Sequence, residues 1–151
     1  MKCIKLSSEL IKRIQSHGEK CYPEEGAGFL LGRVDSNESE VHEIIPIMNA
    51  REKTNRHNRY LITPEDMLSG EQTAIEFGLD VIGVFHSHPD HPEYPSEFDR
   101  EWALPWYSYL ITSVQDGMAK GSRSWKLLED HSAFEEEKVI VLSERVKTFE
   151  S

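Results

Sequence analysis

The sequence predicts an α/β fold, in which helices cover both faces of one mixed β-sheet. Three observations support this prediction: amphipathic helical segments, short apolar segments typical of buried strands, and the alternation of the two along the chain. The 151 residues are enough for one domain with a hydrophobic core of its own. We therefore expect a single domain over residues 1–151.

The first predicted helix begins close to the start of the sequence. Ser7 is a suitable N-cap, and Pro23 ends the segment because proline lacks the backbone N–H that a helix interior needs. Helical spacing places an apolar stripe on one face: Leu10, Ile11, Ile14 and Cys21. Such a stripe is typical of a helix that packs on a core.

A β-hairpin is predicted after this helix. The apolar, glycine-rich run 26–32 is typical of a strand that lies under a close-packed neighbour. Turn residues occupy 35–39, and a second apolar run follows at 41–47. The polar and basic segment 49–58 comes next, and we expect it to form an exposed, mobile loop.

A second helix and a buried strand follow. A brief predicted strand at 59–62 leads to Thr63, which is a suitable N-cap because a proline and two acidic residues come directly after it. Gly78 is expected to end this helix. The apolar run 79–85 then predicts a buried strand, which continues directly into a pair of histidines.

The rest of the chain contains a proline-rich loop, a short helix and more strands. The short helix is predicted to start near Ser96. Three further strands are predicted, at 107–112, 122–128 and 139–142. We interpret the acidic run 135–137 as a solvated turn or face, because charge runs usually lie in solvent.

The net charge argues against two classes of partner. Lys and Arg number 17 and Asp and Glu number 27, so the formal charge is −10 with histidine neutral. A chain with this balance repels phosphate backbones and anionic membrane surfaces. No apolar run approaches the ~18 residues that a membrane-spanning helix needs. We therefore expect neither a nucleic acid nor a membrane as partner.

The sequence also predicts a cytoplasmic location. Its charged first residues lead into a polar helix and do not resemble a signal peptide. The two cysteines, Cys3 and Cys21, form neither a Cys-x-x-Cys pair nor a disulfide framework. Metal binding and redox chemistry based on thiols therefore have little support.

One group of polar residues has the composition of a metal site. His86 and His88 are two residues apart at the end of a predicted strand, so their side chains lie on one face of the sheet. A capped first turn after Ser96 would direct Asp99 back toward them. Two neutral imidazoles and one carboxylate form a known zinc ligand set, which leaves a fourth position for water.

Other interpretations of the same residues remain open. A histidine pair at strand spacing is often only structural, because short motifs match by chance. Ser96 and Asp99 also fit a helix capping box that needs no metal. His91 is a candidate spare ligand, although an exposed loop histidine is the commoner case.

The pattern as a whole resembles a known signature. His86-x-His88-Pro89, six residues, Ser96, two residues and Asp99 is similar to the JAMM signature of the JAB/MPN metalloprotease family, and Glu25 matches an upstream family segment. This resemblance implies that His86, His88 and Asp99 bind Zn²⁺, one ion per chain. It further implies that Glu25 is the general acid/base and that Ser96 stabilises the oxyanion.

The resemblance also implies a fold and a substrate. The implied fold is a cytidine-deaminase-like three-layer α-β-α domain with a mixed central sheet. Stand-alone members as short as this chain resemble enzymes that cleave after the C-terminal Gly-Gly of a ubiquitin-like or sulfur-carrier protein. The sequence departs from relatives at positions 26–27, where bulkier residues or cysteine are frequent, and this affects packing near Glu25.

Three other functions can be distinguished from a zinc peptidase by the residues present or by the metal that the protein contains. A metal-free MPN-type interaction scaffold would contain no zinc. A mononuclear iron oxygenase also uses two histidines and one carboxylate, but Glu25 would then have no task. A zinc deaminase is disfavoured because its Pro-Cys-x-x-Cys ligand pair is missing.

Overall fold

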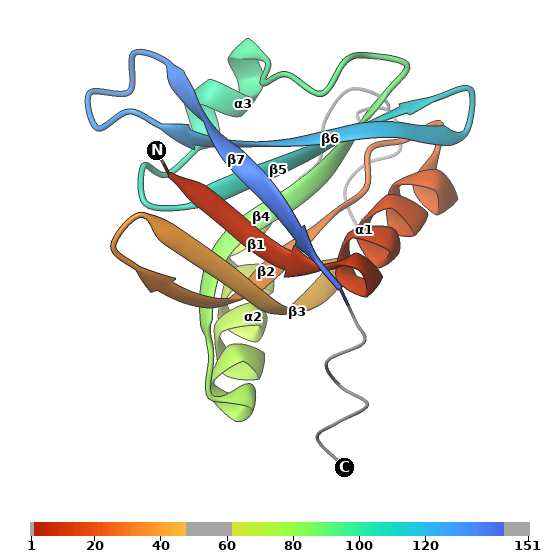
Figure 1. Cartoon of the computed structure of the whole chain (residues 1–151). Helices are drawn as coiled ribbons and strands as arrows, with labels where there is room; N and C mark the ends of the chain where they lie inside the picture. Colours follow the sequence, from red (N-terminus) through yellow and green to blue (C-terminus); the bar gives the residue numbers. More distant parts are fainter. Residues whose placement is uncertain (1, 48–61, 144–151) are drawn as a thin grey trace.

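The computed structural model describes residues 2–47 and 62–143, and Figure 1 shows how the elements are arranged. The strands are β1 (Cys3–Ser7), β2 (Ala27–Asp35), β3 (Glu38–Ile47), β4 (Asp80–Pro89), β5 (Ser108–Gln115), β6 (Met118–Leu127) and β7 (Phe134–Leu142). The helices are α1 (Ser8–Cys21), α2 (Pro64–Phe77) and α3 (Glu97–Trp102). The predicted loop 49–58 and residues 59–61 of the predicted brief strand lie outside the described residues.

The strands form one mixed sheet, as predicted. Their order is β1-β3-β2-β4-β5-β6-β7, and the sheet closes into a barrel because β7 pairs with β1. Strand β1 runs parallel to both β3 and β7, and β4 runs parallel to β5. The other neighbours are antiparallel. The sequence did not predict this closure into a barrel.

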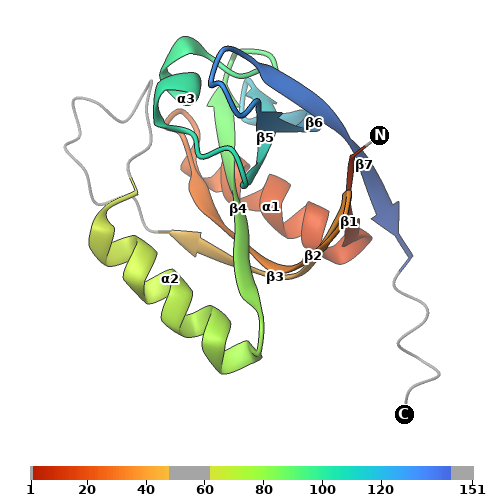
Figure 2. The same ribbon diagram turned by 90° about the vertical axis from the view of Figure 1, so that its left-hand side faces the viewer.

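Helices cover opposite faces of β4, which Figure 2 shows edge-on between α1 and α2. On one face, Leu10 and Ile14 of α1 belong to the same buried cluster as Phe85. On the other face, Ala74 of α2 packs in a cluster with Val84. Successive side chains of a strand point to opposite faces, so β4 contributes to two cores at once. The expectation that both faces are covered is met at this strand.

The predicted helix starts are confirmed. The Ser7 hydroxyl oxygen accepts a hydrogen bond from the Leu10 N–H at 3.1 Å. Thr63 and Asp66 form a reciprocal capping box, and α2 ends at Gly78, whose φ of 71° is left-handed.

Among the described residues, no helix has the length and apolar character needed to cross a membrane.

Strand β1 was not predicted, because the sequence there was interpreted as the approach to a polar helix. Ile4 and Leu6 are fully buried and alternate with less buried neighbours. Three of the five residues are apolar, but Cys3 and Ile4 are adjacent, so no strict alternation of apolar and polar residues marks a strand.

The interpretation of the acidic run 135–137 as a solvated turn or face is wrong in part. These residues lie within β7, and Glu137 is only 1% exposed. The Ser124 hydroxyl donates a hydrogen bond to the Glu137 carboxylate at 2.7 Å. Glu137 is turned inward, while the preceding residues Glu135 and Glu136 stay exposed. One residue of the acidic run is therefore buried, which the sequence pattern did not indicate.

Candidate metal centre

Strand β4 positions both histidines. The strand continues through the pair, so His86 and His88 share a face with Val84, and both imidazoles are buried. In the parallel pairing with β5, His86 lies beside Ile111 and His88 beside Ser113. The prediction that one strand presents both side chains on one face is confirmed.

A helix cap brings Asp99 to the histidines. The Ser96 hydroxyl oxygen accepts from the Asp99 N–H at 3.1 Å, and the Ser96 N–H donates to Asp99 Oδ2 at 2.8 Å. The carboxylate then lies with Oδ2 3.2 Å from His88 Nε2 and Oδ1 3.6 Å from His86 Nε2. From the sequence, a helix capping box and a metal site were two alternative interpretations of Asp99. In the structure, Asp99 takes part in the capping box and also in the cluster with the histidines.

These three side chains match the donor set of a metal site. One ligand atom from each of His86, His88 and Asp99 lies within 4.8 Å of the others, and all three residues are buried. Two imidazole nitrogens and a carboxylate oxygen are a known set for a catalytic zinc site. The residues present therefore fit a divalent metal ion.

A backbone carbonyl orients one of the imidazoles. His88 Nδ1 lies 2.9 Å from the Pro92 carbonyl oxygen. A carbonyl can only accept, so Nδ1 is the protonated nitrogen and Nε2 faces the cluster. Metal-binding histidines usually have such a partner on their other nitrogen. The sequence predicted a proline-rich loop here but gave no sign that its carbonyl would fix the imidazole.

The electrostatics of the cluster favour two of the protonation states that a metal needs. Burial lowers the pKa of His86 to about 4, so this imidazole is neutral near pH 7. Burial raises the pKa of Asp99, but the neighbouring His86, His88 and Ser96 N–H together lower it more, and the net pKa lies well below its usual range. Burial lowers the pKa of His88, but the Asp99 hydrogen bond and charge raise it more.

Glu25 lies beside the cluster but comes from a different part of the chain. It is in the loop between α1 and β2, is buried, and places Oε1 3.9 Å from His86 Nδ1. The pairing of Ala27 with His86 in adjacent strands brings this loop to the cluster of His86, His88 and Asp99. The structure therefore brings together the distant carboxylate and the histidine pair that the sequence analysis grouped.

Two of the residues that the sequence suggested for the site, Ser96 and His91, are exposed and are not part of the buried cluster. Ser96 is exposed and caps α3, and its O–H retains a hydrogen that it can donate. His91 is exposed and lies outside the cluster, and its carbonyl oxygen accepts a hydrogen bond from the Ser113 hydroxyl. The structure therefore gives no support to His91 as a spare ligand.

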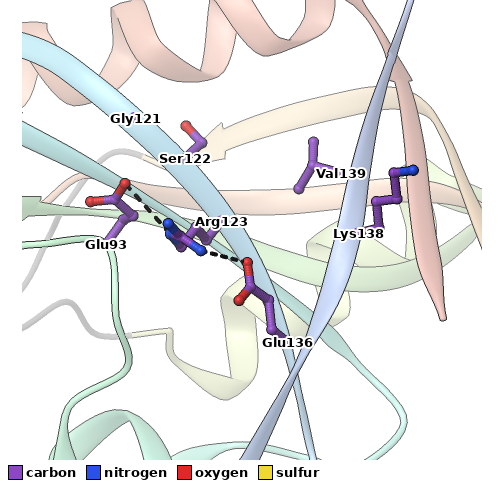
Figure 3. A pocket seen from close by; sticks show the side chains of 7 residues that line it. All are labelled: Glu93, Gly121, Ser122, Arg123, Glu136, Lys138 and Val139. Carbon is purple, nitrogen blue, oxygen red and sulfur yellow. Dashed lines mark hydrogen bonds and ion pairs between the residues drawn. The ribbon is translucent and has the colours of Figure 1, made fainter. Parts of the chain in front are cut away.

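Side chains of strand β6 contact the loop that joins the histidines to Asp99. Arg123 lies between Glu93 of this loop and Glu136 of β7, at 3.8 and 2.9 Å, as Figure 3 shows. Its guanidinium also lies 5.1 Å from the Tyr94 ring centroid, and Trp125 Nε1 donates to the Glu93 carbonyl. Glu93, Arg123 and Glu136 border a pocket of about 390 Å³. No pattern in the sequence indicated this attachment.

A match to a protein-family model identifies the family of this chain. The model for prokaryotic homologs of the JAB domain matches residues 7–128, which is most of the chain. The chain belongs to the prokaryotic JAB family. The resemblance that the sequence analysis based on the histidine, serine and aspartate spacing is thereby confirmed.

Curated proteins similar to this JAB family chain include named peptidases. A desampylase of Haloferax volcanii is 36% identical over 97 residues, covering 64% of this chain and 67% of that protein. A probable TtuB-protein conjugate cleaving protease of Thermus thermophilus is 29% identical, covering 70% and 69%. A CysO-cysteine peptidase of Mycobacterium tuberculosis is 28% identical over 145 residues, covering 92% and 91%.

Solved structures extend the similarity to the three-dimensional fold. The solution structure of a protein from Desulfitobacterium hafniense has a TM-score of 0.81 at 27% identity, covering 93% of this chain and 94% of that one. That of a Salinibacter ruber protein has a TM-score of 0.72 at 40% identity, with 91% of each covered. The JAB family chain thus shares its fold with these proteins over nearly its whole length.

Proposed function

We propose that this chain is a zinc-dependent peptidase or isopeptidase that hydrolyses the amide bond after the C-terminal Gly-Gly of a ubiquitin-like or sulfur-carrier protein. The observation that supports this most is the buried cluster of His86, His88 and Asp99 with Glu25 beside it. The names of the similar proteins, desampylase and CysO-cysteine peptidase, point to the same class of substrate.

The proposed ligands of the ion are His86, His88 and Asp99. A zinc ion in such a site supplies Lewis-acid chemistry, because it lowers the pKa of bound water to ~7 and polarises a carbonyl group. The chain contributes the His86 imidazole, which burial keeps neutral, and the Asp99 carboxylate, which the neighbouring histidines and the Ser96 N–H keep ionised.

Glu25 is the proposed general acid/base. Its carboxylate accepts the proton of the attacking water and passes it to the departing nitrogen, which otherwise would leave as a high-energy amide anion. The loop holds this carboxylate close to His86 and inside the protein, where few solvent molecules compete for the proton.

Ser96 is the proposed oxyanion donor. Its oxygen is occupied as the cap of α3, while its O–H remains available to a carbonyl oxygen that gains negative charge. Because the cap fixes the hydroxyl in place, little reorganisation is needed when the charge develops.

The remaining parts of the proposal concern the whole chain. We propose a single JAB/MPN domain over residues 1–151, with the cytidine-deaminase-like three-layer arrangement, which α1 and α2 on opposite faces of β4 support. We also propose a cytoplasmic location, in keeping with two free thiols, Cys3 and Cys21. The basic segment around 51–59 is proposed to bind an acidic carrier surface.

The direct test uses a purified carrier protein with an amino acid attached to its C-terminal Gly-Gly. The zinc-loaded enzyme is expected to release that amino acid, and mass spectrometry of the carrier measures the mass that is lost. Elemental analysis of the same sample gives the zinc content. An intact conjugate in the presence of fully zinc-loaded protein would overturn the proposed substrate class.

A further inference from the structure

The Glu25 loop is attached to the metal-binding strand at the residue between the two histidines. The Gly26 N–H donates to the Ser87 hydroxyl oxygen at 2.8 Å, and the Ser87 N–H donates to the Gly26 carbonyl at 2.9 Å. Ser87 is buried and its side chain points away from the imidazoles, toward α1. A Cβ added at Gly18 of α1 would lie 3.0 Å from the Ser87 Cβ.

A second attachment lies at the other end of the same loop. The Tyr22 hydroxyl donates to Asp90 Oδ2 at 2.7 Å. Asp90 is itself fixed, because its Oδ1 accepts from the Asp116 N–H at 2.8 Å and its own N–H donates to the Val114 carbonyl at 2.7 Å. Asp90 therefore couples the loop to the turn between β5 and β6.

We propose that Ser87 and Asp90 are positioning residues, which set the location of the Glu25 carboxylate relative to the metal-binding imidazoles. Glu25 lies between the two attached residues, Tyr22 and Gly26. Both attachments lead to one short segment, 86–90, which also contains His86 and His88. The inference rests on the proposed function, since it assigns Glu25 a role in proton transfer.

The geometry separates the effect on Glu25 from the effect on the metal. Ser87→Ala removes the acceptor of the buried Gly26 N–H, so the loop must shift or leave that group unsatisfied. The imidazoles lie on the opposite face of the strand and keep their own contacts to Asp99 and Pro92. Small displacements of a reacting group lower turnover strongly, by about 100-fold for 1 Å.

The test compares Ser87→Ala and Tyr22→Phe with a matched control, Ser124→Ala. Ser124 is a fully buried serine of the same sheet, but its hydroxyl bonds to Glu137 in β7 and not to the Glu25 loop. For each full-length variant, kcat and KM are measured with a Gly-Gly conjugate, the zinc dissociation constant with a competing chelator, and Tm by calorimetry.

We expect Ser87→Ala to lower kcat at least about tenfold, with KM and the zinc dissociation constant within about threefold of the parent. Ser124→Ala is expected to lower Tm and leave kcat unchanged. Tyr22→Phe removes one hydroxyl from an exposed hydrogen bond, so we expect a kcat loss of about threefold at the parental Tm. This mild variant decides the question if Ser87→Ala does not fold.

Two results would overturn the inference. One is a kcat for Ser87→Ala and Tyr22→Phe as high as that of the control. The other is a kcat loss that follows zinc loss in proportion, which would indicate damage to the metal site. A parallel Glu25→Gln variant separates the hypotheses: if Glu25→Gln stays active, the proposed proton-transfer role of Glu25 fails. If it is inactive while both test variants behave like the control, only the positioning role fails.

Discussion

Asp99 combines two tasks in one carboxylate. Its Oδ2 accepts the Ser96 N–H and also lies 3.2 Å from His88 Nε2, while Oδ1 faces His86. The same side chain therefore starts a helix and completes the candidate metal cluster. Asp66 in α2 makes the same capping box with Thr63 and is not part of the candidate metal cluster among the described residues. The chain thus provides its own comparison for separating the two tasks.

Asp99→Asn is expected to lose zinc while the fold persists. An asparagine oxygen still accepts the Ser96 N–H, but the negative charge that favours a divalent cation is gone. Zinc content per chain, measured by elemental analysis, should fall to near zero together with activity. Asp66→Asn is the control and should retain both; full zinc occupancy in Asp99→Asn would show that Asp99 is not a ligand.

Glu25→Gln is expected to abolish hydrolysis while zinc stays near one ion per chain. Glutamine keeps the size of the side chain but cannot accept the proton, and general acid–base catalysis contributes typically ~10²–10⁴-fold. Turnover and zinc content of the same preparation provide the measurement. The adjacent Glu24→Gln serves as control and should remain active. Unchanged turnover in Glu25→Gln would remove this residue from the mechanism.

At the scale of elements, helices were predicted better than strands. Ser7, Thr63 and Ser96 each cap a helix where the sequence placed the cap, because a capping side chain bonds to backbone only a few residues away. Strand bounds depend on distant partners. Strand β6 begins at Met118, earlier than predicted, and β7 includes the acidic residues that were interpreted as a solvated turn or face.

Ser96→Ala tests whether the cap of α3 also acts in catalysis. Loss of a serine or threonine cap destabilises a protein by about 1 kcal/mol, so Ser96→Ala and Thr63→Ala should lower Tm by similar amounts. Only Ser96→Ala should also lower kcat, by about 100-fold if its O–H is the oxyanion donor. Equal kcat in the two variants would leave Ser96 with the capping role alone.

At the scale of the whole molecule, the candidate site was partly predictable. His86, His88, Ser96 and Asp99 lie within one short segment, so their spacing indicated a cluster directly. Glu25 lies far away in sequence, and only the family resemblance joined it to the others. The hydrogen bond between His88 and the Pro92 carbonyl depends on how the loop packs, and no local sequence pattern predicts this packing.

Removal of the metal should destabilise the whole domain without unfolding it. The proposed ligands come from β4 and α3, so an ion bound there favours the folded state by RT ln(1 + [L]/Kd), about 4 kcal/mol at 1,000 Kd. Dialysis against a chelator should lower Tm, and added zinc should restore it. The circular dichroism spectrum should persist, because two hydrophobic clusters stabilise the sheet. Asp99→Asn should show no zinc-dependent Tm.

The pairing of β1 with β7 has a consequence for how the chain folds during synthesis. Among the strands that the structure describes, β1 is synthesised first and β7, with which it has its longer pairing, is synthesised last. Before β7 is made, the pairing of β1 within the described residues consists of three positions with β3. Strand β4 and helix α3, which contain the proposed metal ligands, are made before β7, so these segments can come together while the barrel is still open.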